Sequence, residues 1–150
     1  MFRNWRYVST HPVRDPQKAL DAFQKVAKMM QDDAIVLKEI GLAYYALHEY
    51  QKAIETWERL LRARSEDAPW MDMGIIYAQL GNFEKALKAF GKVIKEMPNN
   101  HYALKEMGLA YRHLGRIRET RECFELARLK AEKDGNAQAA KNYSELAESI

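Results

Sequence analysis

The chain has 150 residues and a formal net charge of +3, and its 24 basic and 21 acidic side chains are interleaved, which argues against a surface dedicated to nucleic acid. Its length suffices for one folded domain, and its lone Cys123 cannot form an internal disulfide. No apolar run approaches the roughly 18 residues of a membrane span, and the first residues lack the apolar stretch of a signal peptide, so we expect a cytoplasmic protein.

Residues 1–12 show no helical periodicity but contain three aromatic residues, Phe2, Trp5 and Tyr7. Two interpretations are open. The first, which we favour, is that these side chains fold back over the exposed face of the first helix, because an uncovered repeat end would expose apolar surface. The second is that they mark the place where a longer protein was cut.

Helices are expected from residue 16 onward. Asp15 followed by Pro16 is typical of an N-cap and a first-turn proline, and apolar residues then recur at spacings of three and four up to about Gln31. Gly81 and Gly115 suit the left-handed backbone that ends a helix. Three helix pairs are expected at about residues 34–47 with 50–63, 68–80 with 83–97, and 101–114 with 117–131.

A last helix is expected after Gly135, with Asn136 as its N-cap. One stripe of this helix is apolar and the opposite face is polar, as the end of a stacked array requires. We therefore expect a complete C-terminal end and a chain that starts within a repeat.

Residues 67–100 contain small, aromatic and proline residues at fixed spacings, W-x2-M-G-x2-Y, then A-x3-F, then P. They are Trp70, Met73, Gly74, Tyr77, Ala86, Phe90 and Pro98. Two antiparallel helices pack closely only where small residues lie at their crossing and larger side chains fill the space around it. The spacing closely resembles the tetratricopeptide repeat signature, which has a period of about 34 residues.

Related sets stand on both sides of this stretch. The following set is Leu104, Met107, Gly108, Tyr111, Gly115, Thr120 and Phe124. The preceding set is Leu37, Ile40, Gly41, Tyr44, Ala53 and Trp57, with one residue missing near Ser65 and Glu66. Further upstream, Ala19, Phe23 and Val26 match only the second half of a unit. Thr120 replaces the usual alanine, so its hydroxyl is expected to bond back to its own helix and the third repeat to pack less tightly.

The resemblance implies an all-α fold, an α-solenoid of antiparallel helix pairs in a right-handed superhelix. It would contain three full repeats, an N-terminal half repeat and a C-terminal capping helix. We expect a single domain, 1–150, divided into 1–33 (N-terminal segment and half repeat), 34–66, 67–100 and 101–134 (repeats) and 135–150 (capping helix).

The sequence contains no glycine-rich phosphate loop, zinc-spaced cluster or nucleophile elbow. Cys123 is interpreted as a structural thiol, because no basic surroundings are evident from the sequence. The four histidines lack the i, i+4 pairing that places two metal ligands on one helical face. We therefore expect no enzyme activity, no cofactor, no metal and no small-molecule substrate.

In tetratricopeptide arrays the first helix of each pair lines an inner, concave groove, and the resemblance implies that the inward side chains lie between the signature residues. The candidate partner-binding residues are Lys38, Leu42, Tyr45, Met71, Ile75, Gln79, Tyr102, Lys105, Leu109, Arg112 and His113, with Ile35, Ala46, Ala68 and Ala78 on the same face. This set is aliphatic, aromatic and cationic, and suits a hydrophobic, possibly acidic segment of a partner protein. The alternative is that some of these residues only pack between repeats.

Chaperone-binding members of the family hold a terminal carboxylate with a clamp of lysine, arginine and asparagine side chains. Lys38 matches the first clamp lysine, but Leu42, Asp72, Tyr102 and Glu106 stand where the other clamp residues are expected. The resemblance therefore disfavours an adaptor for chaperone tails.

We expect a non-catalytic protein–protein interaction scaffold that binds a peptide or helical segment of a partner in the concave groove. The alternative is a self-associating structural or assembly protein, a homo-oligomer, in which the incomplete N-terminal repeat docks on a neighbouring copy. An RNA-binding repeat would need a continuous basic stripe, which the interleaved acidic residues oppose.

Overall fold

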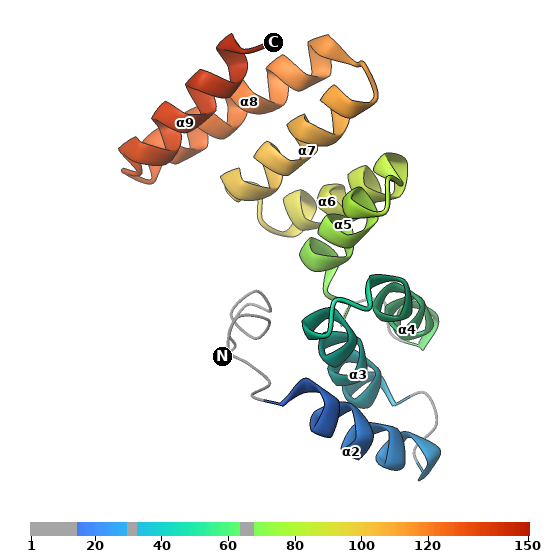
Figure 1. Ribbon diagram of the computed structural model, residues 1–150. Coiled ribbons are helices and arrows are strands. Elements are labelled where there is room, and N and C mark those ends of the chain that lie inside the picture. Colours follow the sequence, from blue (N-terminus) through green and yellow to red (C-terminus); the bar gives the residue numbers. More distant parts are fainter. Residues whose placement is uncertain (1–14, 30–32, 64–67) are drawn as a thin grey trace. The chain divides into compact units, whose positions relative to one another are not determined.

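The computed structural model describes residues 15–29, 33–63 and 68–150. These residues form helices joined by short turns (Figure 1). The helices are α2 (Pro16–Met29), α3 (Ala34–Ala46), α4 (Tyr50–Ala63), α5 (Trp70–Gln79), α6 (Phe83–Glu96), α7 (His101–His113), α8 (Ile117–Lys133) and α9 (Ala137–Glu148). The predictions for residues 1–12, for the end of the first helix near Gln31 and for the missing residue near Ser65 lie outside the described residues.

Short polar side chains start most of these helices by accepting hydrogen bonds from first-turn backbone N–H groups, which have no partner within the helix. Lys18 donates its N–H to Asp15 Oδ1 at 3.1 Å, and Ala139 donates to Asn136 Oδ1 at 3.0 Å, so both predicted N-caps are confirmed. Asp33, Asn82 and Asn100 cap α3, α6 and α7 in the same way.

Two helix boundaries differ from the prediction by two residues. Helix α5 begins at Trp70 instead of residue 68, because Pro69 disfavours a helical conformation in the residue before it. Helix α8 continues to Lys133 instead of ending at Ala131, and it ends just before Gly135, which has a left-handed φ of 77°.

The turns within the helix pairs use a left-handed backbone residue. Gly81 and Gly115 have φ values of 80° and 73°, as predicted. In the turn between α3 and α4 the same conformation is adopted by His48, with φ of 61°, and its Nδ1 lies 2.8 Å from the Tyr50 hydroxyl. A non-glycine residue in this region is uncommon and carries a steric cost.

The chain forms two compact units, with the boundary between Ile76 and Tyr77 inside α5. In the first unit α3 packs against both α2 and α4. A buried cluster joins α2 to α3, and Gln24 of α2 donates a 3.0 Å hydrogen bond to the Tyr44 hydroxyl of α3. The cluster consists of Leu20, Val36, Ile40 and Ala43, with Phe23, Tyr44 and Leu47 packed against it.

In the second unit α7 packs on α6 and α8, and α8 packs on α9. A buried cluster of mostly small side chains joins α7, α8 and α9, namely Leu104, Ala127, Ala131, Ala140 and Tyr143. Alanines on the facing helices permit this close approach. Helix α9 is therefore held by α8 over its apolar stripe, as predicted for the last helix.

Glycines lie where the helices of a pair cross. A Cβ atom on Gly41 of α3 would overlap the indole ring of Trp57 on α4. A Cβ atom on Gly108 of α7 would lie 2.5 Å from Cε1 of Phe124 on α8. Both rings are fully buried, so the expected packing of small residues against large ones is observed in both pairs. Thr120 is also buried, and its hydroxyl donates to the Arg116 carbonyl at 2.8 Å, as predicted.

Candidate partner-binding surface

The candidate residues of the first unit differ in how far they reach the surface. Lys38, Tyr45 and Ile75 are half-buried, whereas Leu42 and Met71 are only 2% and 8% exposed. A partner would therefore meet the first three side chains, while Leu42 and Met71 pack beneath the surface. Ile35, on the same predicted face, is 74% exposed.

Tyr45 is held by two other aromatic residues. Its ring centroid lies 5.6 Å from that of Tyr50 and 6.3 Å from that of Trp57. Tilted pairs at these separations are favourable and restrict the orientation of the ring. The half-buried Tyr45 ring is therefore restricted in orientation by its two neighbours.

All of the candidate residues of the second unit have side chains that solvent reaches. Tyr102, Lys105 and Leu109 are half-buried, and the other three, Gln79, Arg112 and His113, are exposed. His113 stacks on Phe83 of α6, with ring centroids 4.5 Å apart and an interplanar angle of 4°.

Lys105 and Tyr102 form a cation–π pair on α7. The Lys105 Nζ lies 4.5 Å from the centroid of the Tyr102 ring and 3.4 Å from Oε1 of Glu106. The aromatic face and the neighbouring carboxylate both attract the ammonium group. The cation is therefore held beside an aromatic surface.

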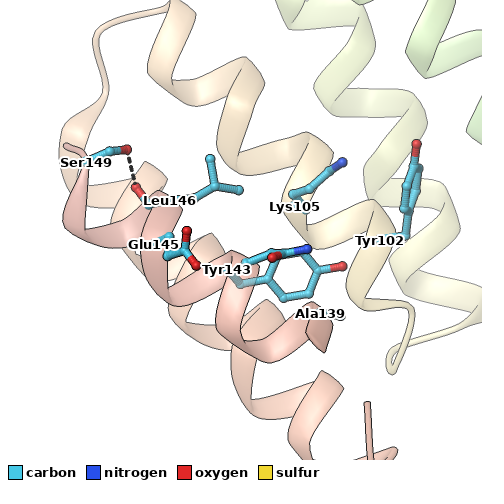
Figure 2. A pocket seen from close by; sticks show the side chains of 8 residues that line it. Tyr102, Lys105, Ala139, Tyr143, Glu145, Leu146 and Ser149 are labelled. Atoms are coloured by element: carbon cyan, nitrogen blue, oxygen red, sulfur yellow. Dashed lines mark hydrogen bonds between the residues drawn. The ribbon is translucent and has the colours of Figure 1, made fainter. Parts of the chain in front are cut away.

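A pocket of about 560 Å³ lies between α7 and α9 (Figure 2). Helix α7 contributes two of the candidate residues, Tyr102 and Lys105. Helix α9 contributes Ala139, Asn142, Tyr143, Glu145, Leu146 and Ser149. We call this the α7–α9 pocket, and its volume is in the range of protein sites that hold small ligands or single side chains.

Sequence reasoning missed the α9 side of this pocket. The apolar stripe of α9 was identified by its spacing and interpreted only as a cap for the array. The flank of that stripe, with Asn142, Glu145 and Ser149, lies beside α7. Asparagine caps precede α6, α7 and α9 alike, so the caps did not indicate that α9 would lie beside α7.

Tyr143 links α9 to the start of α7. Its hydroxyl lies 2.7 Å from Nδ1 of His101, and Nε2 of His101 lies 3.9 Å from Oδ2 of Asp134. Burial raises the pKa of Tyr143, and the nearby Tyr102 and Glu106 raise it further. The hydroxyl therefore stays protonated at neutral pH, and the ring forms a fixed part of the pocket floor.

Cys123 lies half-buried on α8. Burial, followed by the charges of Glu122 and Glu119, raises the pKa of its thiol to about 11. The thiolate is the nucleophilic form, so these surroundings disfavour a reactive cysteine. In the described ranges no group of three histidine, cysteine, aspartate or glutamate side chains is placed to hold a metal ion, and no helix has both the length and the apolar character to span a bilayer.

Family comparison agrees with the repeated helix pairs. The tetratricopeptide repeat family matches the chain over residues 68–100 and residues 13–69, which together are more than half of its length. The chain belongs to the tetratricopeptide repeat family. The resemblance inferred from the spacing of glycine, tyrosine and phenylalanine is thereby confirmed.

Curated relatives of this tetratricopeptide repeat chain include a member of a protein complex and an assembly protein. The BBSome complex member BBS4 of Bos taurus is 27% identical over 97 residues, which are 65% of this chain and 19% of the relative. The Photosystem I assembly protein Ycf3 of Synechococcus sp. (strain CC9605) is 33% identical over 91 residues, which are 58% of this chain and 53% of the relative. The chain thus spans about half or less of these relatives.

Solved structures of MamA share the fold. One has a TM-score of 0.72 and 27% identity, covering 83% of this chain and 69% of that one. Another, from Desulfovibrio magneticus RS-1, has a TM-score of 0.73 and 21% identity, covering 96% of this chain and 92% of that one. The predicted all-α solenoid of tetratricopeptide repeats is therefore confirmed.

Proposed function

We propose that the chain is a non-catalytic scaffold that binds a peptide or helical segment of a partner protein with the predicted groove residues. Tetratricopeptide repeat proteins generally mediate protein–protein interactions and assembly. Two relatives, a BBSome complex member and a Photosystem I assembly protein, agree with this role.

The observation that carries the proposal is the Tyr102–Lys105 pair beside the α7–α9 pocket. An aromatic face, a cation and a hollow of about 560 Å³ lie together on one helix and its neighbour. Aromatic residues held in place contribute strongly to protein interfaces, because they bury much area and lose little rotamer freedom. Such a surface offers a peptide both apolar contact and a partner for an acidic group.

The test is partner capture by the full chain and by Tyr102→Ala. Tyr102 is half-buried and contributes to a pocket wall, so its truncation should spare the helices and weaken binding. Leu42→Glu is less suitable, since Leu42 is 2% exposed and the variant would place a charge in the core. Pull-down from cells with mass spectrometry should show proteins that are retained by the wild type and lost with Tyr102→Ala.

The matched control is Lys141→Ala, on the exposed side of α9 and outside the pocket. It should retain the same proteins as the wild type. Identical sets of captured proteins for the wild type and for Tyr102→Ala, with both chains folded, would contradict the proposal.

A further inference from the structure

The walls of the α7–α9 pocket carry opposite charges. Lys105 presents an ammonium group from α7, and Glu145 presents a carboxylate from α9 (Figure 2). Within the described part of the chain the Glu145 carboxylate forms no ion pair, and it is exposed to solvent. Leu146 and Tyr143 of α9 provide apolar surface in the same pocket.

This arrangement changes the partner chemistry expected from the sequence. The candidate residues of α7 are apolar, aromatic and cationic, which favours an acidic segment. The α9 side adds a carboxylate that would repel a purely acidic segment and attract a basic side chain. A purely acidic segment would bring like charge to the Glu145 carboxylate. A purely basic segment would bring like charge to the Lys105 ammonium group, which the Glu106 carboxylate at 3.4 Å neutralises in part.

We infer that the α7–α9 pocket selects a partner segment of mixed charge, in which an apolar side chain lies between an acidic and a basic residue. The acidic residue pairs with Lys105, the basic residue pairs with Glu145, and the apolar side chain packs on Leu146 and Tyr143. The inference rests on the proposed function and names the chemistry of the segment that this site binds.

Two contacts hold parts of the pocket in place before a partner arrives. The ammonium group of Lys105 lies over the Tyr102 ring, and the Tyr143 hydroxyl is bonded to His101 at 2.7 Å. Side chains that are already ordered lose less conformational freedom on binding. The cationic wall and the apolar floor are therefore preformed, and a short segment suffices to recognise them.

The experiment uses the full chain and a phage-displayed library of random dodecapeptides. Enriched peptides are synthesised, and their Kd values are measured by fluorescence anisotropy with the wild type, Lys105→Ala and Glu145→Gln. Each variant should weaken binding by about two- to five-fold, as expected for a solvent-exposed ion pair. Replacing the acidic peptide residue by alanine should abolish the effect of Lys105→Ala, and replacing the basic one should abolish that of Glu145→Gln.

Lys141→Ala and Glu148→Gln are matched controls, because both side chains are exposed on α9 and lie outside the pocket. Neither should change the Kd values appreciably. Circular dichroism of all four variants should match the wild type, since each replaced side chain contacts solvent.

Three outcomes would overturn the inference. Enriched peptides whose binding ignores Lys105→Ala and Glu145→Gln but is lost with Tyr45→Ala would exclude this pocket and leave the proposed function intact. A dimer in sedimentation that dissociates with Glu145→Gln would assign the pocket to a second copy of the chain. A library that yields no enriched peptide would count against the proposed function as well.

Discussion

Helix pair α3/α4 and helix pair α7/α8 make the same crossing with different rings. Gly41 leaves room for the Trp57 indole, and Gly108 leaves room for the Phe124 phenyl ring. The Trp57 Nε1 also donates a 3.2 Å hydrogen bond to the Lys38 carbonyl of α3, which a phenyl ring cannot do. In both pairs a glycine therefore lies opposite a large ring, and the identity of the ring differs.

The two pairs also differ at their turns. His48 adopts the left-handed conformation between α3 and α4, and Gly115 adopts it between α7 and α8. In both pairs a cation lies over a tyrosine of the first helix. In α3/α4 the cation is Lys52 within the second helix, and in α7/α8 it is Arg116, the N-cap of the second helix. The Nζ of Lys52 is 5.8 Å from the Tyr44 ring centroid, and Cζ of Arg116 is 5.0 Å from that of Tyr111.

The crossing glycines should give the largest effects. Gly41→Ala is expected to lower the free energy of unfolding by about 3 kcal/mol and Gly108→Ala by about 2 kcal/mol, because a fully buried ring must move to admit a methyl group. Gly41→Ala costs more, since the indole is also hydrogen-bonded. Urea denaturation followed by circular dichroism measures both.

Gly91→Ala in α6 is the matched control for Gly41→Ala and Gly108→Ala. A Cβ atom at this helical position meets nothing within 4 Å, so the variant should be stabilised by about 0.5–1 kcal/mol. If all three variants lost similar stability, close packing at the crossings would not be the cause.

Exchanging the rings should have the next largest effect. Trp57→Phe removes a buried ring volume and the hydrogen bond to Lys38, so we expect a loss of about 2 kcal/mol. Phe124→Trp adds volume to a closed site and should cost about 1–2 kcal/mol. Thermal and urea unfolding check these values, and a neutral Trp57→Phe variant would contradict the expected contribution of the indole ring and its hydrogen bond.

Cys123 provides a chemical probe in the α7/α8 pair. Because its pKa is raised from 9.0 to about 11, the fraction of thiolate at pH 8 should be at least about ten-fold below that of a cysteine in a short unfolded peptide. Alkylation by iodoacetamide, followed by mass spectrometry against pH, should be correspondingly slow and should rise only toward pH 11.

The raised pKa of Cys123 also makes the stability of the folded chain depend on pH. The folded chain holds this proton more tightly than the unfolded chain, so the contribution of the thiol to stability is complete below about pH 9 and is lost as the pH rises toward 11. Gly108→Ala, which loosens the pair, should accelerate alkylation. An alkylation rate at pH 8 equal to that of the peptide would contradict the buried environment.

The turns should give the smallest effects. Gly115→Ala places a Cβ atom on a residue with φ of 73° and should cost about 1 kcal/mol. His48→Gly should change stability by less than about 0.5 kcal/mol, because relief of the left-handed backbone offsets the lost contact with Tyr50. Differential scanning calorimetry of both variants measures the two changes in stability. A large loss of stability in His48→Gly would show that the His48–Tyr50 contact dominates that turn.

Features that depend on nearby residues were predictable from the sequence. The spacing of Gly41, Gly108 and their partners identified the helix pairs, since a crossing is specified within one hairpin. Asp15 and Asn136 were predicted as N-caps, because a cap depends only on the following turn.

Features that depend on how helices rotate against one another were not predictable. The burial of Leu42 and the place of Glu145 on a wall of the α7–α9 pocket depend on helix rotation, which no spacing within one helix specifies. The left-handed conformation of His48 had no signal either, because the sequence lacks glycine at that turn. The division into repeats at residues 34–66, 67–100 and 101–134 and the use of a concave groove remain predictions.

The short separation of Gly41 from Trp57, and the equal separation of Gly108 from Phe124, have a consequence for folding kinetics. Contacts between residues close in sequence form with little loss of chain entropy, and proteins rich in such contacts fold rapidly. Each hairpin holds its own glycine, ring and turn residue. During synthesis, α3/α4 can therefore close soon after its second helix is made, before the residues of α7 and α8 exist.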